Sequence, residues 1–570
     1  MVNITKRGFY RVIIFGFITL AFFSCENQNN PVAPEFVNPV LLEGIALPVT
    51  GMTPAEMVTE TDRYTGTITW SPNHPTFQAL TIYTATITLK AKTGFSFQGM
   101  PANNFRVSGA ISKNANNSGI VTAMFPRTDI VQWERTESTG RSDSGFNAVA
   151  VDPSGNIYAA GAQRGVSIYT YGSEVTAESA SNSENVVLVK YDSKGTAKWA
   201  RTVSTVNIAS PIRSGSNFYA VAADTLGNIY AAGYQNDTGV YTYGDGVTAQ
   251  GTAQSPANST YSNVLLVKYD PDGTPQWART VSTGTNSSCF NSVAVDSAGN
   301  VYAAGYQWGD EIYTYGPGIT TQGFIADNAV LVKFDPSGTA QWAKTFDEEM
   351  GSYRFNAIVI DAYDNVYAAG SHGNSVILVK YDTDGSTVWA RTVIADTGTS
   401  SFNALAVDSS GNIYAAGSQG SGNFTYAPGV SVQSNAASAY SSHNVVLVKY
   451  NSDGTAQWAR TVGAGKCDSS FNAVAVDPSG NVFGAGRHRG ESITYGPGVQ
   501  AQGIGIILVK YDTNGIAKWA RTVRYGSASF NAAAVDLSGN VFAAGFQSTR
   551  VNAQSYTHSN ALLICYDGNK

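Results

Sequence analysis

Tyrosine is concentrated in five related segments of the chain, IYTYGSEVTAES, VYTYGDGVTAQG, IYTYGPGITTQG, FTYAPGVSVQS and SITYGPGVQAQG. A tyrosine ring offers a large contact area and one hydroxyl group, which suits binding to a sugar or to a protein. The alternative is that each ring packs its own segment onto the fold, because a recurring feature is more typical of structure than of a single pocket. The candidate binding residues are Tyr169, Tyr171, Tyr241, Tyr243, Tyr313, Tyr315, Tyr426 and Tyr495.

Charged side chains also recur at fixed positions. The first copy of the pattern carries Asp152, Lys190 and Arg201, and later copies carry the same residue types with two departures, Lys344 and Cys565. The strands that hold these residues are expected to pack between neighbouring sheets. The cations should therefore meet carboxylates or backbone carbonyls, since a buried charge needs a partner. A basic ring with a binding role is the alternative.

The sequence holds no recognisable catalytic or metal-binding pattern. The repeats bring together no nucleophile, base and orienting group, and the five histidines are scattered. No cysteine pair has metal-ligand spacing, and Cys289, Cys467 and Cys565 do not form a disulfide framework. We predict no catalytic residue, no metal and no cofactor. A total of 35 basic and 41 acidic residues gives a net charge of −6, which argues against binding to nucleic acid.

The residues above lie in or between two phrases that recur together seven times. The first phrase begins as FNAVAVDPSGNIYAAG at Phe146, and the second as NVVLVKYDSKGTAKWARTV at Asn185. Each phrase reads as two strands joined by a tight turn whose Gly or Asn tolerates positive φ. Four-stranded units repeated radially make a β-propeller. We therefore predict an all-β fold in which residues 129–570 form a seven-bladed β-propeller.

The ends of the repeat region are expected to meet. The seventh copy stops at LLICYDGNK without a fourth strand, whereas IVQWERT, just before the first copy, matches QWARTV. Residues 130–136 should therefore complete the seventh blade and close the ring. This match also gives every blade one tryptophan on its fourth strand, where a large ring would pack against the next blade. The predicted structural tryptophans are Trp133, Trp199, Trp277, Trp342, Trp389, Trp458 and Trp519.

The repeats resemble a family of bacterial β-propeller repeats sometimes abbreviated SBBP and, through VAVDPSGNIYAAG, the NHL-type repeats. The resemblance covers residues 129–570 and implies the fold without implying an activity. Because strand directions alternate, the tight turns should lie on one face of the disc and the variable loops and insertions on the other. Variable loops on a rigid scaffold usually carry binding. The face that bears the insertions is therefore the expected binding face.

Residues 36–128 differ from the repeats. TGTITWSP and YTATITLKAK alternate apolar or β-branched residues with small polar ones, and FRVSGAI and GIVTAMF add short strands between turns. About ninety residues of this kind make a small β-sandwich. The stretch resembles the Ig-like modules of bacterial surface proteins, which usually act as spacers or in adhesion.

The N-terminus has the features of a targeting signal. Three basic residues precede an apolar run at residues 12–23, which is shorter than the ~20 residues needed to span a bilayer. The run ends in AFFSC, and residues 1–24 resemble a bacterial lipoprotein signal peptide in which Cys25 is lipidated. An ordinary cleaved signal peptide is the alternative. Residues 25–35, beginning CENQNNPVAPE, are polar and read as a flexible tether.

These observations predict a monomeric, noncatalytic lipoprotein of the bacterial cell envelope, at the outer membrane or cell surface. Its partners would be the membrane, through the lipid anchor, and a protein or glycan ligand held by the propeller, with no nucleic acid involved. The alternative is an envelope hydrolase or lyase whose active site lies on the insertion-bearing face. That alternative requires a few polar residues, each present in one copy, to converge near the centre of that face.

Overall fold

The structure is a computed structural model, and it describes residues 35–36, 41–45, 48, 53–77, 81–107, 110–125, 131–137 and 142–568, with breaks in the last range at 208–214, 257–258, 325, 347–350, 394–397, 435, 437–441, 464–467, 524–527 and 551–556. Every regular element in these ranges is a β-strand, as predicted. None of the described residues forms a helix suited to cross a membrane. The signal segment, Cys25 and Cys467 lie outside the described residues. The chain divides into two compact units near residue 126.

The N-terminal unit contains one four-stranded antiparallel sheet and two short parallel pairs. Threonines alternate with apolar residues in the two long strands of the sheet, so that one face is buried in a core that includes Trp70, Tyr83 and Phe105. The strand order of the sheet is β3 (Tyr64–Ser71), β4 (Thr84–Ala91), β8 (Ile120–Met124) and β7 (Ile111–Asn114). The parallel pairs are β1 (Glu35–Phe36) with β5 (Phe95–Ser96) and β2 (Leu41–Leu42) with β6 (Arg106–Val107).

The C-terminal unit contains seven four-stranded antiparallel sheets, which we call blades one to seven. Blade one is β10 (Ser144–Val151), β11 (Ile157–Arg164), β14 (Glu184–Tyr191) and β15 (Ala197–Thr202). Blade two is β17 (Ser216–Ala223), β18 (Ile229–Asn236), β21 (Ser262–Tyr269) and β22 (Pro275–Arg279). Blade three is β23 (Ser288–Val295), β24 (Val301–Trp308), β27 (Asp327–Phe334) and β28 (Ala340–Phe346).

The remaining blades follow the same order. Blade four is β29 (Tyr353–Ile360), β30 (Val366–His372), β31 (Ser375–Tyr381) and β32 (Thr387–Val393). Blade five is β33 (Ser400–Val407), β34 (Ile413–Gln419), β37 (Asn444–Tyr450) and β38 (Ala456–Thr461). Blade six is β39 (Asp468–Val476), β40 (Val482–Gly496), β41 (Val499–Tyr511) and β42 (Ala517–Val523). Blade seven is β43 (Ala528–Val535), β44 (Asn540–Arg550), β45 (Thr557–Asp567) and β9 (Val131–Thr136).

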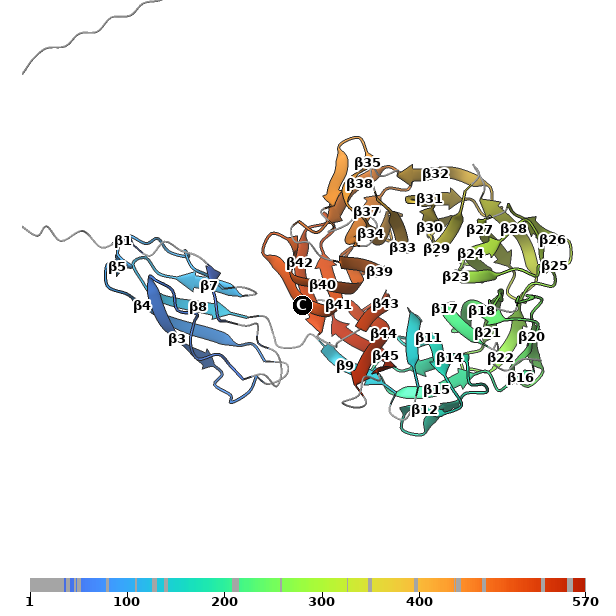
Figure 1. The fold of residues 1–570 in the computed structure, drawn as a ribbon, viewed down its shortest axis with the longest axis horizontal. Coiled ribbons are helices and arrows are strands. Elements are labelled where there is room, and N and C mark those ends of the chain that lie inside the picture. Colours follow the sequence, from blue (N-terminus) through green and yellow to red (C-terminus); the bar gives the residue numbers. More distant parts are fainter. Residues whose placement is uncertain are drawn as a thin grey trace, which may run out of the picture. The chain divides into compact units, whose positions relative to one another are not determined.

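The blades form a closed ring with the first strand of each blade innermost (Figure 1). Each first strand contacts the first strands of both neighbouring blades, including β10 of blade one with β43 of blade seven. The buried apolar residues form clusters that each combine two adjacent blades, and these clusters run all the way round the ring. The core of this unit is therefore divided into layers between blades, which explains the near-continuous apolar runs of the second and third strands.

Closure by a strand from before the first repeat is confirmed. Strand β9 pairs antiparallel with β45, with Thr136 opposite Leu562 and Trp133 opposite Cys565. In addition, the side-chain amide of Gln132 donates a hydrogen bond to the side chain of Asn540, 408 residues away in sequence. The seventh blade therefore unites the two ends of the repeat region, and β9 covers the edge of β45 that would otherwise be unpaired.

The inserted segments fold as hairpins on the outer side of the ring (Figure 1). Each hairpin packs against the fourth strand of its own blade, and the glycine of the first YTYG sequence leaves just enough room, since a Cβ on Gly172 would lie 2.8 Å from Ala197 Cβ. In blade six the insertion is a continuation of β40 and β41. The separate hairpins are β12 (Ile168–Gly172) with β13 (Val175–Glu178), β19 (Val240–Gly244) with β20 (Val247–Gln250) and β16 (Thr205–Asn207), β25 (Ile312–Gly316) with β26 (Ile319–Gln322), and β35 (Gly422–Ala427) with β36 (Val430–Ser434).

Candidate functional site

The eight tyrosines predicted as a binding face do not form one. Their side chains lie beneath the hairpins, and the most exposed of them, Tyr426, is only 8% exposed. They contact the inner strands of their own blades, as where the Tyr171 ring lies 6.0 Å from that of Phe146. The prediction was wrong because each hairpin folds back over its blade and covers the aromatic side. The corrected residues are Tyr169, Tyr171, Tyr241, Tyr243, Tyr313, Tyr315, Tyr426 and Tyr495.

The hydroxyl groups of these tyrosines are used within the fold. In blades one, two, three and five, the tyrosine at the position of Tyr171 donates a hydrogen bond of 2.9–3.0 Å to the side-chain oxygen of a buried glutamine near the end of the second strand. Burial raises the pKa of Tyr171 and Tyr243 well above 10, so these phenols remain donors. The repeated tyrosines thus fasten hairpins to blades, which agrees with the alternative stated from the sequence.

The repeated tryptophans and arginines lie between blades. The Trp199 indole donates to the backbone oxygen of Pro271, while the Arg201 guanidinium donates to the backbone oxygen of Gly273 in the next blade. A Cβ on Gly273 would lie 2.8 Å from the Trp199 ring, so only glycine fits this turn. Arg201 also lies over the Trp199 ring at 5.2 Å. The same pair of hydrogen bonds holds the turn of the following blade from blades one, two, four, five and seven. Blade three has Lys344 in place of the arginine, and in blade six the Trp519 indole has no hydrogen-bond partner among the described residues.

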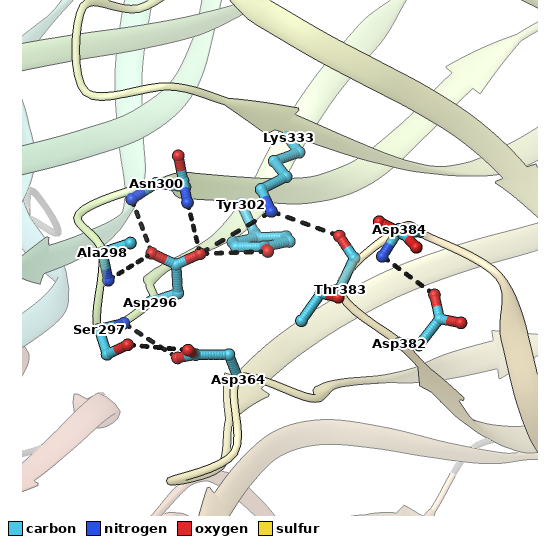
Figure 2. A network of polar contacts seen from close by, with 10 residues as sticks. All are labelled: Asp296, Ser297, Ala298, Asn300, Tyr302, Lys333, Asp364, Asp382, Thr383 and Asp384. Atoms are coloured by element: carbon cyan, nitrogen blue, oxygen red, sulfur yellow. Dashed lines mark hydrogen bonds and ion pairs between the residues drawn. The ribbon is translucent and has the colours of Figure 1, made fainter.

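The repeated aspartates and lysines form a second set of contacts at the same end of the blades, which Figure 2 shows for blade three. Asp296 accepts hydrogen bonds from the side chains of Asn300 and Tyr302 at 2.8 and 3.2 Å. Lys333 lies 3.9 Å from the same carboxylate and donates to the backbone oxygen of Thr383 in blade four. Every one of these groups is engaged in holding a turn, so this end offers no free chemistry in the blade shown.

We call the end of the blades that carries these tight turns the turn face, and the opposite end the loop face. At the loop face each first strand has a β-bulge, because one residue is skipped in the pairing with the second strand. The bulge brings backbone so close that a Cβ on Gly161 or Gly233 would lie 2.0 or 1.9 Å from a carbonyl oxygen. This crowding explains the invariable glycine of the repeated AAG sequence.

The skipped residue is asparagine in six blades, and its side chain joins each blade to the next. Each asparagine donates to the backbone oxygen of the phenylalanine that opens the next first strand, at 2.9–3.1 Å. The side chains and carbonyls together form what we call the asparagine belt. Its members are Asn147, Asn291, Asn356, Asn403, Asn472 and Asn531.

The asparagine belt is interrupted between blades two and three. There the skipped residue is Tyr219, whose side chain is 38% exposed, and none of the described side-chain amides donates to the backbone oxygen of Phe290. A pocket of about 310 Å³ opens at this position. It is lined by Tyr219, Tyr234, Asn236, Thr260, Ser262, Ser287, Cys289 and Tyr306.

Aromatic rings and hydroxyl groups dominate the lining of this pocket. The rings of Tyr219 and Tyr234 lie 5.5 Å apart and inclined by 55°, so that Tyr234 supports the more exposed Tyr219. Blade two presents Ser262 at the start of its third strand, and blade three presents Ser287 before its first strand. None of the lining residues carries a formal charge at neutral pH.

Charged residues flank the pocket on both sides, and each has a partner. The Glu184 carboxylate accepts hydrogen bonds from Tyr234 Oη at 2.9 Å and from the Asn217 amide at 3.4 Å. On the other side Arg354 lies 4.2 Å above the Tyr306 ring and forms an ion pair of 2.8 Å with Asp327. These pairs fix the walls of the pocket rather than leaving charge directed into it.

Burial keeps the ionisable groups of the pocket protonated. It raises the pKa of the Tyr219 and Tyr234 phenols and of the Cys289 thiol, and it raises the pKa of Tyr306 to about 12. At neutral pH these groups are hydrogen-bond donors and not bases or nucleophiles. The arrangement can bind a ligand that offers hydroxyl groups and an apolar face.

The site was missed from the sequence, although a signal for it exists. The phrase at blade two reads FYAVAAD where six blades have Asn after Phe, and only the second strands of blades two and three have Tyr after the AAG sequence. A repeat is recognised by the residues that recur, so a residue that departs in one copy adds nothing to that pattern. The positions of these departures in the repeat show that they meet at one junction.

Metal ligands and reactive cysteines do not gather in the part of the chain that is described. No group of three or more His, Cys, Asp or Glu side chains there is placed to hold a metal ion. Cys289 and Cys565 are both buried as free thiols. The pocket is therefore described by its tyrosines and hydroxyls alone.

Comparison with known proteins adds little on function. No protein-family model matches the chain. Among curated proteins it is similar to an uncharacterized WD repeat-containing protein, L264, of Acanthamoeba polyphaga mimivirus, with 27% identity over 214 residues that cover 35% of this chain and only 15% of that protein.

Solved structures show only distant likeness. The polysaccharide lyase Uly1 has 9% identity and a TM-score of 0.36, covering 74% of this chain and 90% of that one. A protein of unknown function from Dyadobacter fermentans has 11% identity and a TM-score of 0.35, covering 64% and 98%. A gluconolactonase from Xanthomonas campestris has 12% and 0.26, covering 53% and 82%. Such values say nothing of what this chain binds.

Proposed function

We propose that the protein is a noncatalytic binding protein that holds a glycan in the pocket between blades two and three. The observation that carries the proposal is the replacement of the belt asparagine by Tyr219 at the junction where the pocket opens. An exposed tyrosine backed by a second ring stacks well on the C–H face of a sugar. The neighbouring serine, threonine and asparagine side chains supply hydrogen bonds for sugar hydroxyls.

A hydrolase or lyase using the loop face is the second candidate. Several residues that occur in one copy each, including Glu184, Asp327 and Arg354, do gather around this pocket. Against catalysis, Glu184 and Asp327 are held by their own partners, and the phenols and thiol of the pocket have raised pKa values. A general base needs a pKa near the working pH. Binding without turnover is therefore the function that this geometry favours.

The test is a glycan screen with the full-length protein and two variants. Tyr219→Asn introduces the residue of the other six blades, so it should restore the belt hydrogen bond while removing the stacking ring. We expect this variant to fold at least as well and to lose binding by a factor of ten or more. Tyr363→Asn, which changes an 82% exposed tyrosine on the turn face, is the matched control and should bind normally.

The outcomes separate the candidates. Undiminished binding by Tyr219→Asn would move the site elsewhere. Release of new reducing ends or unsaturated sugars from any bound glycan would favour the enzyme. If the protein bound another protein and no glycan, the proposed ligand would change from a glycan to a protein.

We further propose that the protein is anchored to the bacterial cell envelope through a lipid on Cys25. The support is the sequence alone, in which basic residues, a short apolar run and a small residue precede this cysteine. A Cys25→Ser variant should leave the membrane fraction or remain uncleaved, as followed by detergent partitioning and by labelling with a radioactive fatty acid. Unchanged partitioning and no label on the natural protein would refute the anchor.

A further inference from the structure

A second exposed aromatic residue lies beside the pocket and belongs to the same junction. Trp308, at the end of β24, is 40% exposed and stands outside the repeated tryptophan positions. Its backbone N–H donates a hydrogen bond of 2.8 Å to the backbone oxygen of Ser287, a residue that lines the pocket. Its ring lies 6.4 Å from Tyr261, which stands in sequence between the lining residues Thr260 and Ser262.

The size of the pocket limits what it can hold by itself. Its volume of about 310 Å³ is at the lower end of the ~300–1,000 Å³ of typical ligand sites. A pocket of this size suits one or two sugar units. A longer ligand would have to leave over the rim, where the Trp308 and Tyr261 rings provide an aromatic shelf.

The charges around the pocket select against one class of sugar. The Glu184 carboxylate, which contacts the lining residue Tyr234, already accepts two hydrogen bonds. The Arg354 guanidinium, which contacts the lining residue Tyr306, is paired with Asp327. No free cation is left among the described lining and flanking residues to compensate an acidic sugar. A uronate in this pocket would lose part of its hydration and come near the negative charge that Glu184 holds behind Tyr234, which is unfavourable in a partly buried site.

We infer that the ligand is an uncharged oligosaccharide whose terminal one or two units enter the pocket against Tyr219 and whose following units lie over Trp308. This inference rests on the proposed glycan-binding function and names its substrate class. It makes two demands that the general function does not make. Affinity should increase with chain length through Trp308, and it should fall when a neutral unit is replaced by its uronate.

Calorimetry with matched sugar pairs tests both demands on the full-length protein. The probes are disaccharides and tetrasaccharides of glucose, galactose and mannose, each compared with its uronate counterpart. We expect the neutral member of the binding pair to bind at least tenfold more tightly, with little dependence on salt. Glu184→Gln, which keeps a hydrogen-bond acceptor and removes the charge, should narrow that difference.

The Trp308→Ala variant tests the shelf. It should remove the gain in affinity between disaccharide and tetrasaccharide while leaving the disaccharide within a factor of two. Equal or tighter binding of the uronates, or an unchanged gain with length in Trp308→Ala, would overturn the inference and leave glycan binding intact. Failure of every probe and of the wider glycan screen would instead remove the proposed function, and the inference with it.

Discussion

On the turn face, a tryptophan and an arginine of one blade hold the turn of the next blade at five of the seven junctions. Figure 2 shows the aspartate and lysine contacts of the same face for blade three, where each drawn group has a partner. On the loop face, the equivalent ends of the strands carry different residues in different blades. The asparagine belt is the part of the loop face that still repeats, and it is interrupted where the pocket lies. In a repeat protein, side chains that recur are the ones that hold the repeats together. Side chains that depart from the pattern at one junction are the better guide to function.

The largest loss of stability is expected from removing β9, the strand that closes the ring. Replacing Val131–Thr136 by a Gly/Ser segment of equal length removes a ladder with β45 and the buried part of Trp133. The loss should exceed the ~3–5 kcal/mol of a buried tryptophan, which is comparable to the stability of a whole domain. Thermal unfolding and sedimentation should show early melting and aggregation.

A matched exchange controls for that experiment. Ala456–Thr461, AQWART, is the equivalent strand of blade five. Inserting its sequence in place of Val131–Thr136 should preserve the melting temperature to within a few degrees. If the Gly/Ser chain melts like the exchanged chain, β9 contributes little to the ring.

A single turn-face tryptophan should matter next. Trp277 is 9% exposed, donates to the backbone oxygen of Pro336 and lies beneath Arg279 at 5.1 Å. Trp277→Ala should lower the free energy of unfolding by about 3–5 kcal/mol. Chemical denaturation measures the change, and the exposed Trp308→Ala serves as the control, with a loss below ~1 kcal/mol. If both variants lost similar stability, the repeated tryptophans would contribute no more to stability than a tryptophan outside the repeat pattern.

The buried histidine His488 should make the stability of the protein depend on pH. His488 occupies the position that is glutamine in blades one, two, three, five and seven and His372 in blade four. It is 2% exposed and has no hydrogen-bond partner for either ring nitrogen among the described residues. Burial lowers the pKa of His488 to about 4 from an ordinary 6.5. The folded state therefore binds this proton less readily than the unfolded state, so the contribution is fully present above pH 6.5 and is lost as pH falls to about 4.

The expected size of that loss is about 3 kcal/mol, at ~1.4 kcal/mol per pKa unit. Comparing the natural protein with His488→Gln isolates it from the other titrating groups. Denaturation at a series of pH values should show the difference between the two proteins growing between pH 6.5 and 4. A constant difference would show that His488 is solvated in the folded protein.

The smallest effects are expected in the belt itself. Asn403→Ala removes a hydrogen bond to the backbone oxygen of Phe471 and should cost about 1–2 kcal/mol. Tyr219→Asn should have the opposite sign, with a gain of up to ~1 kcal/mol. Urea denaturation measures both, and a loss of stability in Tyr219→Asn would mean that the tyrosine is there for packing.

The architecture could be predicted from the sequence because the residues that recur in each copy are the ones that form the strands and turns. Two-residue alternation, turn glycines and the match between IVQWERT and QWARTV predicted the sheets and their closure, since these depend on local patterns. Where Tyr171 and its equivalents point could not be obtained in that way. The side chain's environment depends on which way the hairpin folds back, and that is decided by packing against the fourth strand.

The pocket is a different case. Tyr219 was visible as a departure, but its meaning depends on a bulge that turns the skipped residue toward the next blade. A bulge of this kind has no sequence signature apart from the glycine that it requires opposite. The residues around Tyr219 come from two blades, some from the starts of strands and some from the ends of others. They lie together only because the ring folds.

Closure through β9 has a consequence for how the chain is made. The partner groups of Gln132 and Asn540 are 408 residues apart, so a ribosome must synthesise nearly the whole repeat region before the seventh sheet can be completed. Until then β9 has no strand to pair with, and the exposed edges of the blades made first can associate with other chains. Contacts at such sequence separation also slow folding. A nascent chain that stops before residue 557 would therefore be a target for chaperones or proteases, however many of its blades are intact.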